Sequence, residues 1–329
     1  MSHAGPEVIA RAHANIALAK YWGKADVRHN VPAVPSISLT LDQLVTETRV
    51  RFDSSLSEDE VRLDGRRATP AERARVVEML NRVRRAAAIR SRARVWSHNR
   101  FPTAAGLASS ASGFAALAGA ATHAAGLRWK PRKVSALARA SSASAARSIF
   151  GGFVELPAGS KGQKDLSARP LAPADHWDVR LVIAVTKPGP KKVGSTEGME
   201  RSRKTSPFYE SWVADAPKWA RAIKRAVKNR DLETLGAAME KSTLAFHCAA
   251  ITSVPPIFYW APATLAALET VRGLRDRGVC AWATMDAGPH VKVLCARRDA
   301  ARVRHALDRT AGVKRTSVAK PGPSIEVKG

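Results

Sequence analysis

The feature that most constrains this chain of 329 residues is a long run of small side chains between residues 102 and 125. The run reads Pro-Thr-Ala-Ala-Gly-Leu-Ala-Ser-Ser-Ala-Ser-Gly over 102–113 and continues directly into a small-residue helical pattern. Small residues let backbone amides approach an anion, the hydroxyls of Ser109, Ser110 and Ser112 add donors, and a following helix presents its positive end. The run therefore predicts a phosphate-binding loop.

This loop matches neither of two common nucleotide-binding motifs. It lacks the Gly-Lys-Ser/Thr ending of a Walker A loop, and the dinucleotide pattern Gly-x-Gly-x-x-Gly is absent. A second interpretation stays open at this point, because a helix of alanine, glycine and serine can also serve only to pack closely in a core.

Two further segments could supply cations. In residues 14–24, Lys20 and Lys24 are four positions apart beside a strand-like apolar run and could converge on one anionic group. The alternative is an exposed edge whose lysines extend into solvent. Residues 141–148 are again small and rich in hydroxyls and include Arg147. Its guanidinium could bind a carboxylate or phosphate through two hydrogen bonds, although an arginine after serines is usually a surface residue.

One carboxylate stands out near the C-terminal end of the chain. Residues 284–289, Thr-Met-Asp-Ala-Gly-Pro, place Asp286 after an apolar strand pattern and before a turn. Aspartate at such a position is often only a turn former. Its functional interpretation is a carboxylate in a cationic pocket that accepts a hydrogen bond from a substrate hydroxyl. The Gly-x-Ser-x-Gly motif of a serine nucleophile is absent. The histidines also show no His-Glu-x-x-His spacing, so a transition metal bound by protein side chains is not expected.

The charge balance is strongly basic, with 54 Lys and Arg against 28 Asp and Glu, a net charge of +26. Such an excess is typical of proteins that meet polyanions. The densest stretch, residues 62–100, contains 12 arginines, but its apolar residues recur with a helical period. We therefore favour a solvated helix face over a specific nucleic-acid site, because aromatic residues are only 6% of the chain and do not alternate with the basic ones.

Periodicity predicts a mixed α/β chain. Alternation predicts strands at 44–52, 179–186, 280–285 and 290–296, the last two forming a hairpin or strand-turn-strand. The helical period predicts helices at 72–88, 110–125, 133–140, 217–228, 232–244, 263–277 and 300–310. We interpret the basic Gly/Pro-containing stretch 187–198 as a linker. A boundary near residue 190 then gives lobes of 1–190 and 191–329.

Cysteine usage favours a cytoplasmic protein. Cys248, Cys280 and Cys295 form no Cys-x-x-Cys pair, which predicts buried thiols in a reducing compartment. No long apolar run occurs, and the first residues lack the basic flank and apolar stretch of a signal peptide. We therefore expect no membrane partner.

Taken together, the four segments resemble the diphosphomevalonate decarboxylase family, within the superfamily of galactokinase, homoserine kinase, mevalonate kinase and phosphomevalonate kinase. The similar stretches are Asn-Ile-Ala with Lys-Tyr-Trp-Gly-Lys over 15–24, Phe-Pro-Thr-Ala-Ala-Gly-Leu-Ala-Ser-Ser over 101–110, and Asp-Ala-Gly-Pro over 286–289. Residues 148–154, Gly198-Met199 and 255–259 extend the resemblance across most of the chain. The Lys-Tyr-Trp-Gly-Lys motif and the long loop after Pro102 are specific to the decarboxylase branch.

The resemblance implies an α/β (α+β) fold of two lobes, like that of small-molecule kinases. The N-terminal lobe would contain a left-handed β-α-β crossover and the nucleotide loop, and the C-terminal lobe would close over a central cleft. The implied activity is ATP-dependent decarboxylation of mevalonate 5-diphosphate to isopentenyl diphosphate, with release of ADP, phosphate and carbon dioxide. A homodimer is common in the family.

The resemblance also implies roles for the catalytic residues. Asp286 would orient or deprotonate the C3 hydroxyl, with Lys20 near both Asp286 and the transferred phosphate. Arg147 would hold the substrate carboxylate or phosphate, and Asn15 would orient Arg147.

The resemblance likewise implies two sets of binding residues. ATP, with Mg²⁺ bridging its phosphates, would lie against Pro102, Ala105, Gly106, Leu107, Ser109 and Ser110. The phosphorylated substrate would contact Tyr21, Trp22, Lys24, Ser142, Ser144, Arg147, Ser195 and Thr196.

Some positions depart from the family pattern. Val34 and Pro35 replace a polar pair, 140–143 replace Lys-Gly-Ser-Gly, and 242–245 lack the usual polar set. Related enzymes act on mevalonate 5-phosphate or phosphorylate C3 without decarboxylation, and both activities remain alternatives, with the retained Asp286, Lys20 and Arg147 favouring a decarboxylase. A remote alternative is a basic nucleic-acid-binding protein on an inactive scaffold.

Overall fold

The computed structural model describes residues 4–101, 109–186 and 192–329. The strands lie at β1 (Val8–Ala19), β2 (Lys24–Asp26), β3 (Val31–Pro32), β4 (Ser36–Asp53), β5 (Glu60–Leu63), β6 (Arg66–Arg67), β7 (Arg92–Asn99), β8 (Phe153–Leu156), β9 (Arg169–Ala172), β10 (Val179–Val185), β11 (Ala281–Met285), β12 (Val291–Ala296), β13 (Arg315–Ala319) and β14 (Glu326–Lys328). The helices lie at α1 (Pro70–Ala87), α2 (Ser109–Ala124), α3 (Pro131–Ser141), α4 (Ala143–Arg147), α5 (Ser195–Thr205), α6 (Tyr209–Asn229), α7 (Leu232–Ile251), α8 (Pro262–Asp276) and α9 (Ala300–Asp308).

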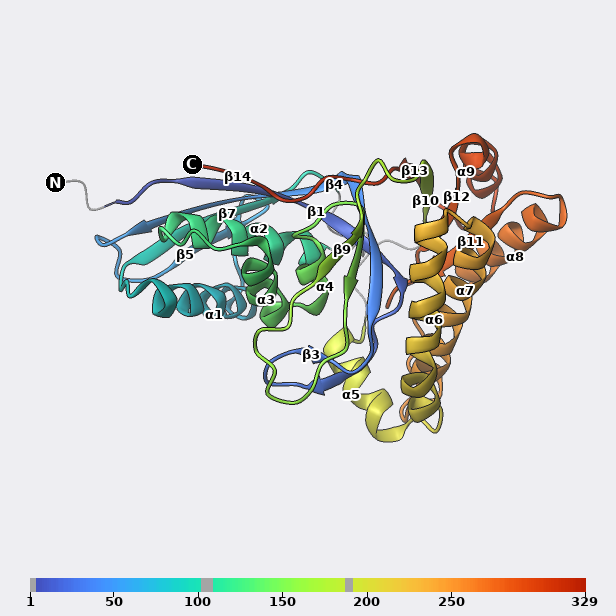
Figure 1. Cartoon of the computed structure of the whole chain (residues 1–329), viewed down its shortest axis with the longest axis horizontal. Coiled ribbons are helices and arrows are strands. Elements are labelled where there is room, and N and C mark those ends of the chain that lie inside the picture. The colour runs from blue at the N-terminus through green and yellow to red at the C-terminus, as the bar shows by residue number, and fades with distance from the viewer. Residues whose placement is uncertain (1–3, 102–108, 187–191) are drawn as a thin grey trace.

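The larger sheet has the strand order β14-β1-β4-β7-β5-β6, and β8 and β9 extend it from β4. Helices α1 to α4 cover one face of this sheet (Figure 1). Helix α2 is buried along almost its whole length, because its alanines pack on β1 and β4. A side chain at Gly119 of α2 would meet Ile325 and Val327, next to and within β14. The small residues of this segment therefore do form a tightly packed core helix.

The smaller sheet has the order β11-β12-β10-β13 and carries α8 and α9 on one side. Helix α7 packs on β11 and β12, and α6 runs beside α7 (Figure 1) and contacts β1, β4 and β9 of the larger sheet. Strand β10, which precedes residue 190, pairs with β12 and β13, which follow it. Strand β14, at the C-terminal end, pairs with β1 in the larger sheet. The division of the chain into lobes at residue 190 stays a prediction.

The mixed α/β architecture and the predicted elements are confirmed, with differences at several ends. Helix α6 begins at Tyr209, eight residues before its predicted start, with Pro217 inside the helix. The earlier start is favoured because Tyr209, Trp212 and Ala216 are all buried on its inner face. Helix α7 continues to Ile251 instead of ending at 244.

The predicted linker 187–198 is wrong at its C-terminal end, since Ser195–Thr205 forms α5. Only Gly198, Met199 and Ser202 of this helix are buried, so its apolar period was too weak to read from the sequence. Strand β7 was missed for a related reason: Ala93 and Val95 face the core while arginines alternate with them.

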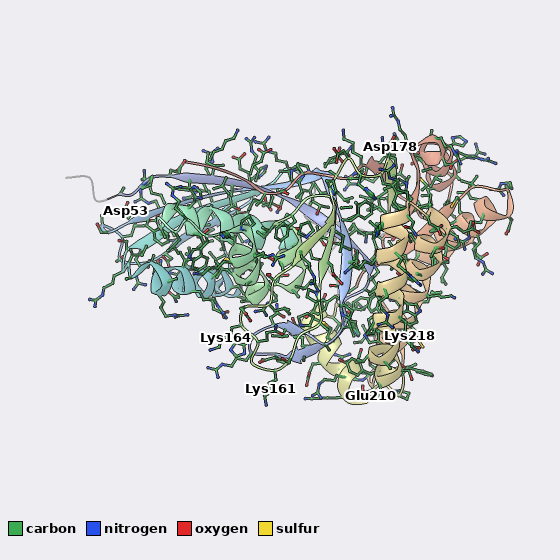
Figure 2. The ribbon with its side chains drawn as sticks, in the orientation of Figure 1. Asp53, Lys161, Lys164, Asp178, Glu210 and Lys218 are labelled. Atoms are coloured by element: carbon green, nitrogen blue, oxygen red, sulfur yellow. The ribbon has the colours of Figure 1, made fainter. Side chains whose placement is uncertain are left out.

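The structure corrects two predictions about individual side chains. The cysteines are not all buried, because Cys248 is exposed and Cys280 is half-buried. The arginines of α1 do not all face solvent: Arg84 is buried and donates a hydrogen bond to Asp59, and the Arg75 guanidinium stacks on the Phe114 ring at 4.5 Å. Other charged side chains, such as Lys161, Lys164 and Glu210, do extend outward around the molecule (Figure 2).

The contact between α7 and β11 predicts a stability effect. A Cβ atom at Gly236 would overlap the indole ring of Trp282, whereas one at Gly273 of α8 meets only the flexible end of Arg277. We expect Gly236→Ala to lower the free energy of unfolding by about 1–3 kcal/mol through overpacking. Gly273→Ala should leave it unchanged or raise it, because alanine favours helix. Denaturant unfolding of both variants measures this, and equal stabilities would contradict the packing described.

Candidate active site

A cavity of about 710 Å³ lies where the end of β1 meets α4, α5 and the turn after β11. It brings together most of the described residues that the sequence singled out. These are Asn15, Lys20, Tyr21, Trp22, Lys24, Ser109, Ser110, Ser142, Ser144, Arg147, Ser195, Thr196 and Asp286. Pro102, Ala105, Gly106 and Leu107 lie outside the described residues.

The centre of the cavity is a carboxylate held between two ammonium groups. Lys20 Nζ lies 2.7 Å from Asp286 Oδ1, and Lys292 Nζ lies 3.2 Å from Asp286 Oδ2. Both lysine side chains are buried, at 3% and 1% exposed, whereas Asp286 keeps 31% of its side chain exposed toward the cavity. A carboxylate with each oxygen engaged by a cation is fixed in orientation.

The fold explains why these three groups meet. The turn between β11 and β12 returns the chain so that Asp286 and Lys292 lie on the same hairpin, with Thr284 paired to Lys292 across the strands. Helix α7 then fixes the end of β1, because the backbone N–H of Lys20 donates to Ser242 Oγ at 3.0 Å. The next residue of α7, Thr243, bonds to the Thr284 hydroxyl at 2.9 Å. Ser242 and Thr243 of α7 thus hold together the strands that carry Lys20 and Asp286.

Burial and mutual charge shift the pKa values of the cluster in opposite directions. Burial lowers the pKa of Lys20 to about 8, although Asp286 opposes the shift. Burial alone would raise the pKa of Asp286, but Lys20 and Lys292 outweigh it and hold that pKa below its usual range. Asp286 is therefore ionised at neutral pH and is a weak proton acceptor.

Arg147 adds another buried cation at the cavity wall. Burial lowers its pKa to about 10, against the attraction of Asp286. Its Nη1 donates to Ser36 Oγ at 2.7 Å, and its Nε has no hydrogen-bond partner within the described ranges. The Asn15 amide nitrogen donates to Ser144 O at 3.0 Å and to Ser148 Oγ at 2.7 Å, so it holds the segment around Arg147, and a direct role of Asn15 in orienting Arg147 stays a prediction.

The residues after Lys20 differ in how they face the cavity. The Tyr21 hydroxyl is buried with no hydrogen-bond partner in the part of the chain described, and burial raises its pKa. The Trp22 indole packs against Phe246 and Tyr259 and donates to Ser202 Oγ, so much of this ring is structural. Burial lowers the pKa of Lys24, whose Nζ lies 3.4 Å from Thr196 Oγ1.

The hydroxyl side chains of the cavity lie at the starts of three helices. Ser109 and Ser110 open α2, and Ser195 and Thr196 open α5, so both helices direct their first residues at the cavity. Ser142 and Ser144 flank the start of α4, with their hydroxyl oxygens 3.0 Å apart. Such N-terminal ends and hydroxyl groups favour anionic ligands.

Sequence reasoning missed Lys292, Arg75 and Ser36. A lysine in the middle of the apolar strand β12 was an available signal, since a charged residue in that position must have a partner when buried. Arg75 lines the cavity from α1, and its separation from the other site segments hid it. Across the described parts of the chain, no three histidine, cysteine or acidic side chains form a metal-binding group.

The fold and the cavity define a two-lobe α/β protein of the small-molecule kinase-like class, with a site built for phosphorylated ligands. Residues 12–168 match the diphosphomevalonate decarboxylase-like N-terminal domain, and residues 181–322 match the mevalonate 5-diphosphate decarboxylase C-terminal domain. The chain therefore belongs to the diphosphomevalonate decarboxylase family.

Individual relatives agree. Diphosphomevalonate decarboxylase mvd1 of Aspergillus fumigatus is 36% identical over 309 residues, covering 88% of this chain and 76% of that protein. The solved structure of the mevalonate diphosphate decarboxylase from Enterococcus faecalis has a TM-score of 0.91 at 39% identity and covers 99% of both chains. The enzyme from Staphylococcus aureus has a TM-score of 0.93 at 35% identity, covering 100% of this chain and 99% of its own.

Proposed function

We propose that this chain catalyses the ATP-dependent decarboxylation of mevalonate 5-diphosphate, giving isopentenyl diphosphate, ADP, phosphate and carbon dioxide. The observation that carries the proposal is Asp286, held between Lys20 and Lys292 at the wall of a cavity that Arg147 also lines. One similar structure is described as a complex with MVAPP, AMPPCP and magnesium. That pair of ligands is consistent with a cavity that must gather two phosphorylated molecules.

The chemistry explains why cations matter more than a strong base. Hydroxide is a poor leaving group, so the C3 oxygen first forms a bond to the γ-phosphorus of ATP while the bond to ADP breaks and the hydroxyl proton passes to solvent water. Phosphate then departs with the C–O electron pair. Finally the bond to the carboxylate breaks, its electron pair forms the double bond, and carbon dioxide leaves. Negative charge builds on phosphate oxygens throughout, and fixed cations stabilise it.

Asp286 would act mainly by accepting a hydrogen bond from the C3 hydroxyl. Its pKa lies below the usual range, so it orients the oxygen toward the phosphorus better than it retains a proton. Lys20, whose ammonium group contacts Oδ1 of this carboxylate, would face the transferred phosphoryl group. Arg147 would hold the substrate carboxylate or phosphate with the guanidinium nitrogens that Ser36 leaves available.

The remaining residues would bind the two phosphate chains. The substrate diphosphate would contact Tyr21, Lys24, Ser142, Ser144, Ser195 and Thr196, with Trp22 as their support. ATP would lie at the start of α2 on Ser109 and Ser110, and on Pro102, Ala105, Gly106 and Leu107. Because the described residues contain no metal-binding group of their own, Mg²⁺ would be held by the phosphates and would neutralise their charge.

We also propose that the protein is a cytoplasmic homodimer. Its free cysteines suit a reducing compartment. No described helix is long and apolar enough to cross a membrane. The exposed side chains of Leu244 and Leu265 are apolar surface that a second copy could cover. Light scattering of the purified protein measures its assembly.

A substrate panel tests the activity. Mevalonate, its 5-phosphate and its 5-diphosphate are each supplied with ATP and Mg²⁺, and ADP and carbon dioxide are scored separately. We expect both products in equal amounts from the diphosphate, and Asp286→Asn should lower kcat by about 10²–10⁴-fold, because the isosteric amide removes the charge that orients the hydroxyl. Turnover of the 5-phosphate instead would identify a monophosphate decarboxylase. ADP without carbon dioxide would identify a C3 kinase.

Lys292 provides a test of the charge cluster with a pH readout. The charge of Lys292 lowers the pKa of Lys20, so Lys292→Met should raise that pKa above its value of about 8. In the pH profile of kcat, the change in rate caused by titration of Lys20 should then move to higher pH, and kcat should fall. Lys292→Arg keeps the charge and should leave this change in rate at the same pH. A fall in kcat without that shift in pH in either variant would show that Lys292 only packs.

A further inference from the structure

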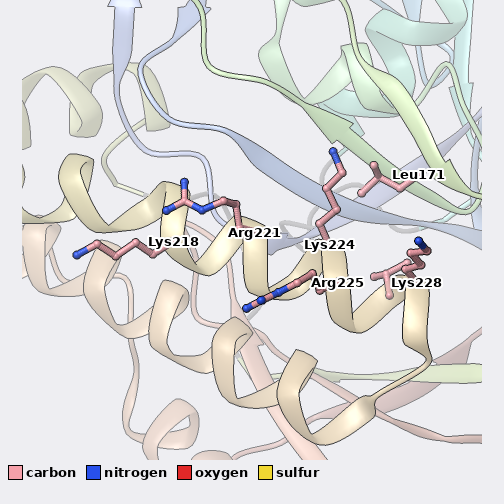
Figure 3. Close-up of a pocket in the computed structure, with 7 residues that line it drawn as sticks. Leu171, Lys218, Arg221, Lys224, Arg225 and Lys228 are labelled. Carbon is pink, nitrogen blue, oxygen red and sulfur yellow. The ribbon is translucent and has the colours of Figure 1, made fainter.

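A second cavity lies outside the candidate active site, on the outer face of α6. It has a volume of about 610 Å³, and we call it the α6 groove. Figure 3 shows its basic side chains rising from successive turns of α6, with Leu171 of β9 across from Lys224. Its lining residues are Leu171, Lys218, Arg221, Lys224, Arg225, Val227 and Lys228.

The charges of the groove are only partly balanced. Lys218 pairs with Asp215 at 2.7 Å, and Lys224 pairs with Glu155 at 3.0 Å. Glu155 is shared, because Arg169 also lies 3.2 Å from it. Arg221, Arg225 and Lys228 have no ion-pair partner within the described ranges. The groove therefore keeps a local excess of positive charge.

This arrangement differs from an ordinary solvated basic helix. On α1, Arg73, Arg82 and the buried Arg84 have acidic partners and Arg75 packs on the Phe114 ring, which leaves the exposed Arg85 as the one described arginine of that helix without such a contact. On α6, like charges instead stand three and four positions apart, as at Arg221, Arg225 and Lys228, where neighbours on a helix repel each other. An anionic ligand in the groove would relieve that repulsion.

The lining also restricts what the ligand can be. It presents five cations and two aliphatic side chains, with neither an acidic group nor an aromatic ring among the lining residues. A peptide would need acceptors for its N–H groups, and bases of a nucleic acid would need stacking surfaces. The cavity is concave and of the size of small-molecule sites, which disfavours a flat membrane surface. Linear phosphate chains have only acceptor oxygens and suit Arg and Lys together.

We propose that the α6 groove is a second binding site for a compact polyphosphate, a linear chain of phosphates that is either free or carried by a nucleotide. The basic positions from Lys218 to Lys228 extend over about 15 Å of helix, enough for several successive phosphates. The site is separate from the residues that would handle ATP and substrate in the reaction, so it stands independently of the proposed activity.

Calorimetric titration tests this with inorganic tripolyphosphate at about 0.1 M salt, where long-range attraction is largely screened. The test variant is Arg221→Gln, Arg225→Gln, Lys228→Gln, which removes the unpaired cations. The matched control, Arg85→Gln, Arg302→Gln, Lys314→Gln, removes the same charge from exposed positions elsewhere. We expect a groove site in the wild-type protein that weakens about tenfold or more in the test variant and is unchanged in the control. The KM for ATP should be the same in all three proteins.

The probes also separate the sources of the phosphate chain. If the groove binds tripolyphosphate and ATP but not AMP, it recognises the chain of phosphates. If the groove binds ATP but not tripolyphosphate, its ligand is a nucleotide. Equal weakening in test and control variants would mean that only net charge matters, and would overturn the proposal. So would a single-stranded oligonucleotide that binds the groove while tripolyphosphate does not. Circular dichroism confirms that both variants keep their helices.

Discussion

The structure depends on one interaction more than any other: the Asp286 carboxylate between the buried ammonium groups of Lys20 and Lys292. Buried charges are costly unless they are paired. Here each lysine has the carboxylate as its counterion, and the carboxylate remains partly open to the cavity. The cluster as a whole carries excess positive charge once Arg147 is included. That excess is what allows one small cavity to receive several phosphate groups.

The two sheets matter because each contributes part of this cluster. Lys20 directly follows strand β1 of the larger sheet, and the β11–β12 hairpin of the smaller sheet carries Asp286 and Lys292. Helix α7 joins the two through Ser242 and Thr243. Close packing of α2 places Ser109 and Ser110 on the same cavity. The two interpretations of the small-residue run are compatible, since tight packing of the helix positions Ser109 and Ser110 at its start.

Much of this arrangement could be predicted from the sequence where a single signal was strong. The apolar periods of α1, α6, α8 and α9 were clear, and the residues of the motifs around Lys20 and Asp286 line one cavity, as the sequence predicts. What failed were features decided by tertiary contacts. The alternating arginines hid β7, and the few buried residues of α5 left no period to detect. The partner of the Asn15 amide could not be known before α4 was placed.

The most direct test of the account is the pKa of the Lys20 ammonium in the folded protein, measured by nuclear magnetic resonance of labelled lysine and assigned with Lys20→Arg. Desolvation beside Lys292 predicts titration near 8, well below the ordinary value for lysine. Titration at the ordinary value of about 10.4 would contradict this account, because it would mean that burial and the charge of Lys292 do not outweigh the attraction of Asp286.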